Sequence, residues 1–161
     1  MTRTGGWLAL AGWVALSLVA GGLGGVASAN AKGFYAQLDQ PGWAPPPWLF
    51  APAWTTLYVL MGVAAWLVWR EAGWARGGTA LWLFIVQLVL NAFWTWLFFA
   101  WRRGAWSFAE IVLLAVAIVA TMVAFARIRA LAAALLLPYL GWVLFASALT
   151  WSLWRRNPTI L

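Results

Sequence analysis

The sequence contains no cysteine and no histidine among its 161 residues. These absences exclude disulfide bonds, thiolate nucleophiles, the usual zinc sites and haem held by His or Cys. Acidic residues are almost as scarce, because Asp39, Glu71 and Glu110 are the only three. A Ser-His-Asp triad is therefore impossible, and a carboxylate pair would have to be assembled by folding from these three. We assign no catalytic residue, metal or cofactor, and expect no conventional hydrolytic chemistry.

Charged residues of both signs make up only 8% of the chain, whereas 66% of the residues are hydrophobic. A soluble domain carries roughly a quarter charged residues. Too little polar surface remains to coat a soluble globule, so an integral membrane protein is predicted. The net charge of +7 does not indicate nucleic acid, because the basic residues lie at the ends of apolar runs. Arg and Lys reach lipid headgroups from such positions.

Five apolar stretches reach the roughly 20 residues that a helix needs to cross a bilayer. They run approximately over 7–28, 48–69, 78–101, 105–126 and 131–154, with charged residues in every interruption. The pattern predicts an all-α bundle of five transmembrane helices, formed by residues 1–161 as a single domain.

The first stretch also resembles a secretory signal peptide, with Arg3 before it and Ala27-Ser28-Ala29 as a cleavage site. Its apolar run is longer than the 7–15 residues of a signal core, which favours a retained helix. The orientation stays open, because each side of the membrane collects five basic residues and the positive-inside rule favours neither. These are Arg3, Arg70, Arg76, Arg127 and Arg129 on one side, and Lys32, Arg102, Arg103, Arg155 and Arg156 on the other.

The connection over residues 29–47 is the only long one between the predicted spans. It contains Pro41-Gly42 and Pro45-Pro46-Pro47, which forbid a continuous helix and stiffen the backbone. Long loops over compact bundles are usually functional. We therefore interpret this segment as a lid over a pocket.

The chain has 16 tryptophans, and they fall into two groups. Several lie at the ends of spans, as in an interfacial aromatic belt: Trp7, Trp69, Trp74, Trp101, Trp106 and Trp154. Others lie inside spans, where the indole N–H needs a partner and the flat face can stack on a planar ligand: Trp54, Trp94, Trp96 and Trp142.

Polar and aromatic side chains recur at helical spacing on three spans. Gln87 and Asn91 share one face of the third span, which continues through Trp94 and Phe98. These amides either bond neighbouring helices, at roughly 0.6–2 kcal/mol each, or contact a ligand, and the sequence favours neither. Trp54 and Tyr58 form an i, i+4 pair on the second span. The fifth span carries Pro138, followed by Tyr139, Trp142, Ala146 and Thr150.

Together, these stripes predict an apolar cavity with a few polar contacts. Pro138 is predicted to kink the fifth helix and open space between helices, and Ala146 leaves room beside Trp142. Glu110 is interpreted as an interfacial carboxylate near a helix start rather than as a proton relay. Gly21 and Gly25 form a GxxxG motif, for which packing inside the bundle is favoured over a dimer contact.

The segments 34–38 (FYAQL), 41–50 (PGWAPPPWLF) and 54–58 (WTTLY) closely resemble the signature of the TspO/MBR family. The family comprises the tryptophan-rich sensory proteins and the mitochondrial translocator protein. Further matches are Gln87, Asn91, Trp94 and Phe98-Phe99 on the third span, and Pro138-Tyr139, Trp142, Phe145-Ala146 and Trp154-Arg155-Arg156-Asn157 on the fifth. The resemblance covers essentially the whole chain beyond the first span.

This resemblance implies a five-helix bundle, often a homodimer, with a cavity beneath the long first loop. Family members bind porphyrins such as protoporphyrin IX, some bind cholesterol, and many bind synthetic benzodiazepine-site ligands. The implied pocket residues are Trp43, Phe50, Trp54, Asn91, Trp142 and Ala146, and the reading of the spans adds Tyr58, Gln87, Trp94 and Tyr139. The two family tryptophans tied to porphyrin breakdown match Trp54 and Trp142. Thr150 and Trp151 stand where the family commonly has Asn and Tyr, which weakens the case for cholesterol binding.

The sequence therefore predicts a multi-pass protein, in a bacterial cell membrane, that binds and senses a tetrapyrrole. Tryptophan stacking under the proline-rich loop would hold the planar ligand. Light- and oxygen-dependent degradation of the porphyrin is one alternative. Transport of porphyrin or sterol-like lipids is another, although no inverted repeat and no line of ionisable residues supports it.

Overall fold

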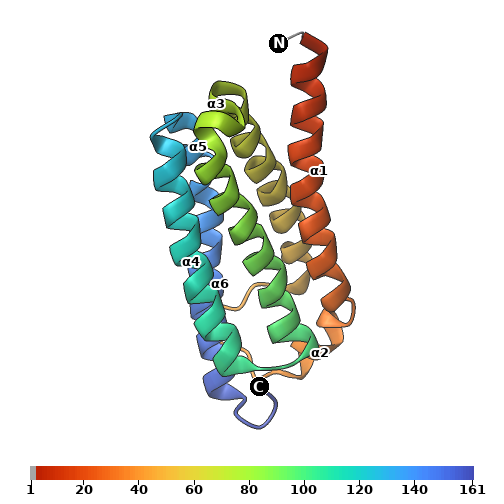
Figure 1. The fold of residues 1–161 in the computed structure, drawn as a ribbon. Helices are drawn as coiled ribbons and strands as arrows, with labels where there is room; N and C mark the ends of the chain where they lie inside the picture. Colours follow the sequence, from red (N-terminus) through yellow and green to blue (C-terminus); the bar gives the residue numbers. More distant parts are fainter. Residues whose placement is uncertain (1–2) are drawn as a thin grey trace.

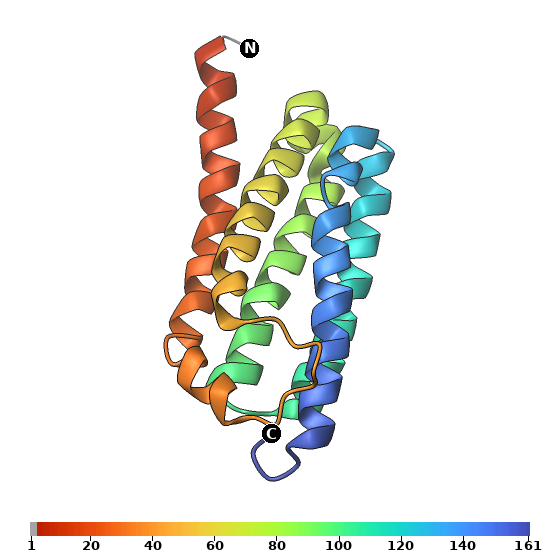
Figure 2. The ribbon, with the colours of Figure 1, turned by 180° about the vertical axis from the view of Figure 1, so that it is seen from behind.

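The computed structural model describes residues 3–161, and it describes burial from Gly6 onward. Its long helices run side by side as one bundle (Figures 1 and 2). They are α1 (Arg3–Ala27), α3 (Phe50–Thr95), α4 (Gly104–Ala126) and α6 (Leu137–Arg156). The shorter elements are α2 (Ala31–Gln37), a 3-10 turn (Pro47–Leu49), a π-helix (Trp96–Ala100) and α5 (Ala130–Ala134).

Helix α3 contains two of the predicted spans, 48–69 and 78–101. Its 46 residues would be about 70 Å long if straight, more than twice the ~30 Å hydrocarbon core of a bilayer. The chain instead reverses at Gly73, where φ is 57° and ψ is −166°, a conformation that glycine adopts at little cost. Figure 1 shows this hairpin at the end of the bundle where α1 begins. Counting both halves of α3, five helices form the bundle over residues 3–161, as the sequence predicts.

The fifth predicted span, 131–154, is interrupted, and the expected role of Pro138 in it is wrong. The short helix α5 ends at Ala134, and α6 begins at Leu137, so Pro138 lies in the first turn of α6. A proline there has no helical hydrogen bond to lose. It therefore starts a helix and does not kink one.

The connection over 29–47 lies at the end of the bundle that also holds residues 101–103 and the C-terminus, which we call the loop end (Figure 2). It begins with α2, whose Phe34 and Tyr35 are buried. The chain then crosses in extended form to the side of α6 before it turns back into α3 (Figure 2). The connection thus covers the loop end.

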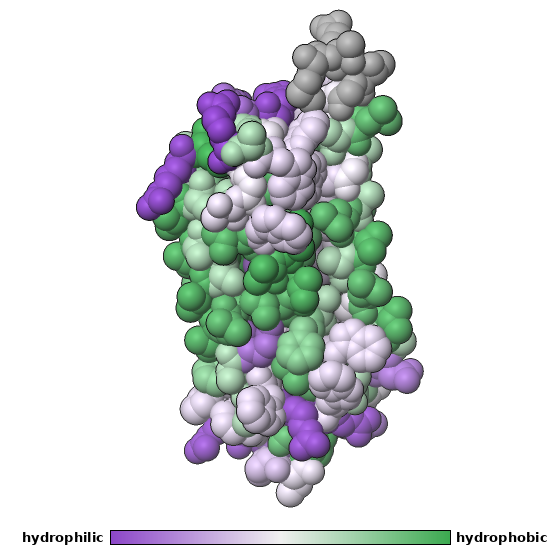
Figure 3. Space-filling model, viewed as in Figure 1, coloured by the Kyte–Doolittle hydropathy of each residue, from purple (hydrophilic) through white to green (hydrophobic). Residues whose placement is uncertain are grey.

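The outside of the bundle is suited to lipid. Many Val and Leu side chains are exposed. Hydrophobic residues cover the middle of the face drawn in Figure 3, and hydrophilic residues gather at both of its ends. Every long helix is apolar enough to cross a membrane by length and composition. The prediction of a multi-pass integral membrane protein is confirmed.

Glu110 lies near the start of α4, as predicted, but its side chain points into the bundle. The residue lies in the second turn of α4, where its side chain is only 8% exposed. Neither carboxylate oxygen has a hydrogen-bond partner within the described residues. The helix rotation that buries Ile111 and Leu114 also turns this carboxyl group inward.

Helix α1 packs against both halves of α3 through its small residues. A Cβ added to Gly21 would overlap the ring of Tyr58, and one added to Gly24 would lie 3.0 Å from the hydroxyl of Thr95. Nothing lies within 4 Å of a Cβ added at Gly25. Packing inside the bundle is therefore confirmed for Gly21 but not for Gly25.

Replacing Gly62 with alanine is expected to lower the free energy of unfolding by about 1–3 kcal/mol, the usual cost of overpacking. The added methyl group would overlap the backbone of Val14 on α1, and a backbone cannot rotate aside. Unfolding in detergent micelles measures the loss. Gly12→Ala is the matched control, because Gly12 is exposed and an added Cβ meets nothing within 4 Å. Equal losses in the two variants would contradict the close approach of α1 to α3.

Candidate functional site

A small hollow lies inside the bundle at the loop end, between both halves of α3 and α6. Its walls are almost entirely aromatic or aliphatic: Tyr35, Phe50, Trp54, Trp94, Phe98, Phe99, Trp142, Ala146, Leu149, Thr150 and Leu153. The free space is about 20 Å³, enough for roughly one water molecule. The hollow is therefore nearly closed in this structure.

Rings from separate helices meet edge to face around the hollow. The ring centroids of Trp54 and Trp142 are 6.3 Å apart with planes at 82°, and those of Phe50 and Trp142 are 6.0 Å apart at 79°. Trp94 stacks on Phe98 at 5.5 Å. These arrangements are favourable for aromatic quadrupoles. They bring three of the four interior tryptophans to one place.

A chain of hydrogen bonds crosses the bundle beside the hollow. The Tyr58 hydroxyl donates to Asn91 Oδ1, and Asn91 Nδ2 donates to the Tyr139 hydroxyl at 3.1 Å. The Tyr139 hydroxyl donates to Gln87 Oε1 at 2.8 Å, and Gln87 Nε2 lies 3.9 Å from the sulfur of Met61. All five side chains are buried. The network thus links both halves of α3 to α6.

This network shows what the side-chain amides of Gln87 and Asn91 bind in this structure. The oxygens of Asn91 and Gln87 accept from tyrosines, and Tyr58 connects to the hollow by stacking on Trp54 at 5.6 Å. Gln87 and Asn91 do not line the hollow. Of the two interpretations that the sequence left open, bonding between helices is the one observed here.

The structure places the ten predicted site residues in three groups. Phe50, Trp54, Trp94, Trp142 and Ala146 line the hollow. Tyr58, Gln87, Asn91 and Tyr139 form the adjoining network. Trp43 lies outside both: it is 51% exposed and its ring meets the edge of Phe145 at 5.8 Å.

Sequence reasoning did not assign Tyr35, Phe98, Phe99, Leu149, Thr150 or Leu153 to the site, although all line the hollow. The stripe through Trp94 to Phe98 and the spacing of Ala146 to Thr150 were signals for two of them. Phe99 had no such signal, because α-helical spacing turns neighbouring residues to different faces. The π-helix, closed by the bond from Trp101 N to Trp96 O, changes this local spacing.

Two indole N–H groups in the lining make no hydrogen bond. Nε1 of Trp94 and Nε1 of Trp142 are buried, and neither has a partner within residues 3–161. Buried donors usually find an acceptor, so both could donate to a guest with acceptor atoms. Burial also raises the pKa of Tyr35, which keeps its hydroxyl protonated; it lies 3.5 Å from the carbonyl of Pro45.

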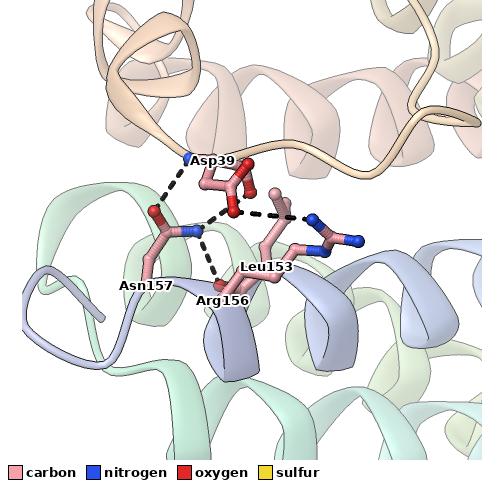
Figure 4. A network of polar contacts seen from close by, with 4 residues as sticks. All are labelled: Asp39, Leu153, Arg156 and Asn157. Atoms are coloured by element: carbon pink, nitrogen blue, oxygen red, sulfur yellow. Dashed lines mark hydrogen bonds and ion pairs between the residues drawn. The ribbon is translucent and has the colours of Figure 1, made fainter.

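The loop is fastened to the end of α6 by the contacts in Figure 4, which we call the loop latch. The backbone N–H of Asp39 donates to Asn157 Oδ1 at 2.8 Å, and Asn157 Nδ2 donates to the Asp39 carbonyl at 3.1 Å and to the Leu153 carbonyl at 2.8 Å. Arg156 and Asp39 add an exposed ion pair at 3.4 Å, of small stabilising value. The latch holds the connection across the loop end.

A much larger groove lies on the outside, between the first half of α3 and α6. Its volume is about 580 Å³, within the range of ligand pockets. It is lined by Pro45, Leu49, Pro52, Ala53, Thr56, Leu57, Leu60, Pro138, Gly141, Trp142 and Phe145. Trp142 belongs to the lining of the groove and to that of the hollow.

Comparison with known proteins agrees with this architecture. The TspO/MBR family model matches residues 13–155. "Translocator protein" of Homo sapiens is 40% identical over 126 residues, which cover 77% of this chain and 75% of that protein. "Tryptophan-rich protein TspO" of Chlorobaculum tepidum is 42% identical over 130 residues, covering 80% and 82%. "Protein CrtK" of Rhodobacter capsulatus is 40% identical over 145 residues, covering 86% of each. The chain therefore belongs to the TspO/MBR family.

Proposed function

We propose that this protein binds a planar tetrapyrrole of the protoporphyrin IX type in the hollow at the loop end, and that it acts as a sensory protein for it. One observation carries the proposal. Trp54, Trp94 and Trp142, which come from three different spans, line the same enclosed space. Indole faces are well suited to stack on a flat aromatic ring. A relative from Cereibacter sphaeroides is named "Tryptophan-rich sensory protein", which agrees with the sensory role.

Binding requires the hollow to widen, because about 20 Å³ is far below the several hundred Å³ of a typical ligand pocket. The lining can move at small cost, since the N–H groups of Trp94 and Trp142 have no partner among residues 3–161 to give up. The hydrogen bonds of Tyr58, Asn91, Gln87 and Tyr139 oppose movement on the other side. The pocket should therefore open by displacement of indoles, while the network stays intact.

Charge at the loop end also suits such a ligand, whose acidic side groups are anionic at neutral pH. Lys32, Arg102, Arg103, Arg155 and Arg156 belong to this end of the bundle. Arg102 lies over the ring of Phe34 at 4.9 Å, close to the loop that covers the site. An amphiphilic macrocycle would stack its rings on the indoles and turn its carboxylates toward these cations.

We expect metal-free protoporphyrin IX to bind at least as tightly as haem. The chain has no His or Cys to act as an iron ligand, so affinity should come from stacking. Titration of the purified protein with each porphyrin, followed by quenching of tryptophan fluorescence, measures both dissociation constants. Haem binding about tenfold tighter would contradict the stacking mechanism, and the absence of saturable quenching by either ligand would overturn the proposed function.

A further inference from the structure

We propose that flat hydrophobic ligands enter the hollow laterally from the bilayer, through the groove between α3 and α6. The side chain of Trp142 is the gate between the groove and the hollow. This inference rests on the proposed function, because it concerns the route to the same site. The groove and the hollow share Trp142 and no other lining residue. The indole of Trp142 therefore separates the large outer groove from the small inner hollow.

The groove opens toward lipid. Its lining is almost entirely apolar, with prolines, glycine and alanine along its walls. Gly141, in the first turns of α6, has nothing within 4 Å of an added Cβ, so there is free space in the groove beside this residue. Pro45 and Leu49 close it toward the loop end. In Figure 2 the loop crosses below the facing parts of α3 and α6.

The gate can move without breaking a hydrogen bond, since Nε1 of Trp142 has no partner in the described chain. Its ring packs against three other aromatic rings: Phe145 at 5.7 Å, Phe50 at 6.0 Å and Trp54 at 6.3 Å. Rotation of this one indole would join the groove, which already has the volume of a ligand pocket, to the hollow.

The competing route leads from water to the hollow under the loop, and the loop latch holds this route closed. Lifting the loop requires both hydrogen bonds between Asp39 and Asn157 to break, together with the ion pair to Arg156 (Figure 4). Porphyrins with large apolar faces also partition into bilayers, so the ligand is concentrated where the groove opens. Both considerations favour access from the membrane.

A bulky residue in the groove tests the route. Gly141→Phe places a ring in the free space beside α6, and Ala53→Phe adds a ring from the opposite wall, on α3; both residues line the groove and neither lines the hollow. The purified variants are reconstituted in phosphatidylcholine vesicles and mixed with vesicles containing protoporphyrin IX, and tryptophan quenching is followed in time. We expect association and dissociation to slow together by about tenfold, with the dissociation constant nearly unchanged, because a blocked path alters rates but not the bound state.

Two matched variants complete the experiment. Gly12→Phe adds the same ring to an exposed glycine of α1 that also has free space around it, and its rates should equal those of the wild type. Asn157→Ala opens the loop latch and should leave the association rate unchanged.

Unchanged rates in both groove variants, or about tenfold faster association in Asn157→Ala alone, would overturn the lateral route while leaving porphyrin binding in place. Absence of saturable binding in the wild type would overturn the route and the proposed function together. A weaker equilibrium affinity at unchanged association rate in the groove variants would also count against the route, since it would show damage to the bound state.

Discussion

Replacing Trp54 with alanine should weaken protoporphyrin IX binding about thirtyfold, since one lost stacking surface is worth roughly 2 kcal/mol and each 1.4 kcal/mol is tenfold. Trp54 occupies the centre of the proposed site. Its ring stacks on Tyr58 at 5.6 Å and lies 6.3 Å from both Tyr139 and Trp142. Trp54 thus joins the hydrogen-bond network to a second indole of the hollow. Fluorescence titration in micelles measures the change in affinity.

The matched control is Trp106→Ala, which removes an indole that is 69% exposed on α4. This variant should bind with wild-type affinity. Trp54→Phe keeps a flat face of smaller area, so its affinity for protoporphyrin IX should lie between those of Trp54→Ala and Trp106→Ala. If Trp54→Ala and Trp106→Ala bind equally well, porphyrin does not occupy the hollow.

Replacing Asn91 with leucine should destabilise the protein by about 2–3 kcal/mol, because it leaves the buried Tyr58 hydroxyl without its acceptor and removes the N–H donor to the Tyr139 hydroxyl. Asn91 accepts from Tyr58 and donates to Tyr139, so its loss breaks the network in the middle. No water is at hand in the bilayer to compensate. Unfolding in mixed micelles, followed by circular dichroism, measures the loss.

A double-mutant cycle separates the network from simple packing. Tyr58→Phe removes one donor, and Asn91→Leu removes its acceptor. If the two groups act through their hydrogen bond, the double variant should lose less than the sum of the single variants, by about 1 kcal/mol or more. Additive losses would contradict a coupled network.

Much of the architecture could be predicted from the sequence, because the summed hydropathy of a segment decides whether it spans the bilayer. A run of about 20 apolar residues must cross the bilayer as a helix wherever it stands. The five spans and the long connection between the first two follow from this rule. The exact position of the turn, at Gly73, and the late start of α6, at Leu137 rather than at residue 131, did not. Charged residues such as Arg70 and Glu71 occur at a helix end as readily as in a loop, so they indicate a break but not its exact position.

The candidate site was predictable only in part. Helical spacing correctly set Gln87 and Asn91 on one face and pointed to Trp54 and Trp142. Spacing within one helix does not determine how that helix is rotated against its neighbour. It therefore cannot predict which residues of the neighbouring helix a side chain contacts. The network joins residues 33, 48 and 52 positions apart, and the location of Trp43 outside the hollow likewise depends on how the loop is fastened.

The sequence by itself determined that most of the chain lies in lipid, how many times it crosses the bilayer, and that no cysteine or histidine is available to it. Each of these depends on residue type and order alone. Only the tertiary structure decided which side chains satisfy one another, that the hollow is nearly closed, and that Trp142 separates it from an outer groove. Those properties depend on the depth and rotation of neighbouring helices. Side-chain packing across several spans sets both, and no single segment encodes them.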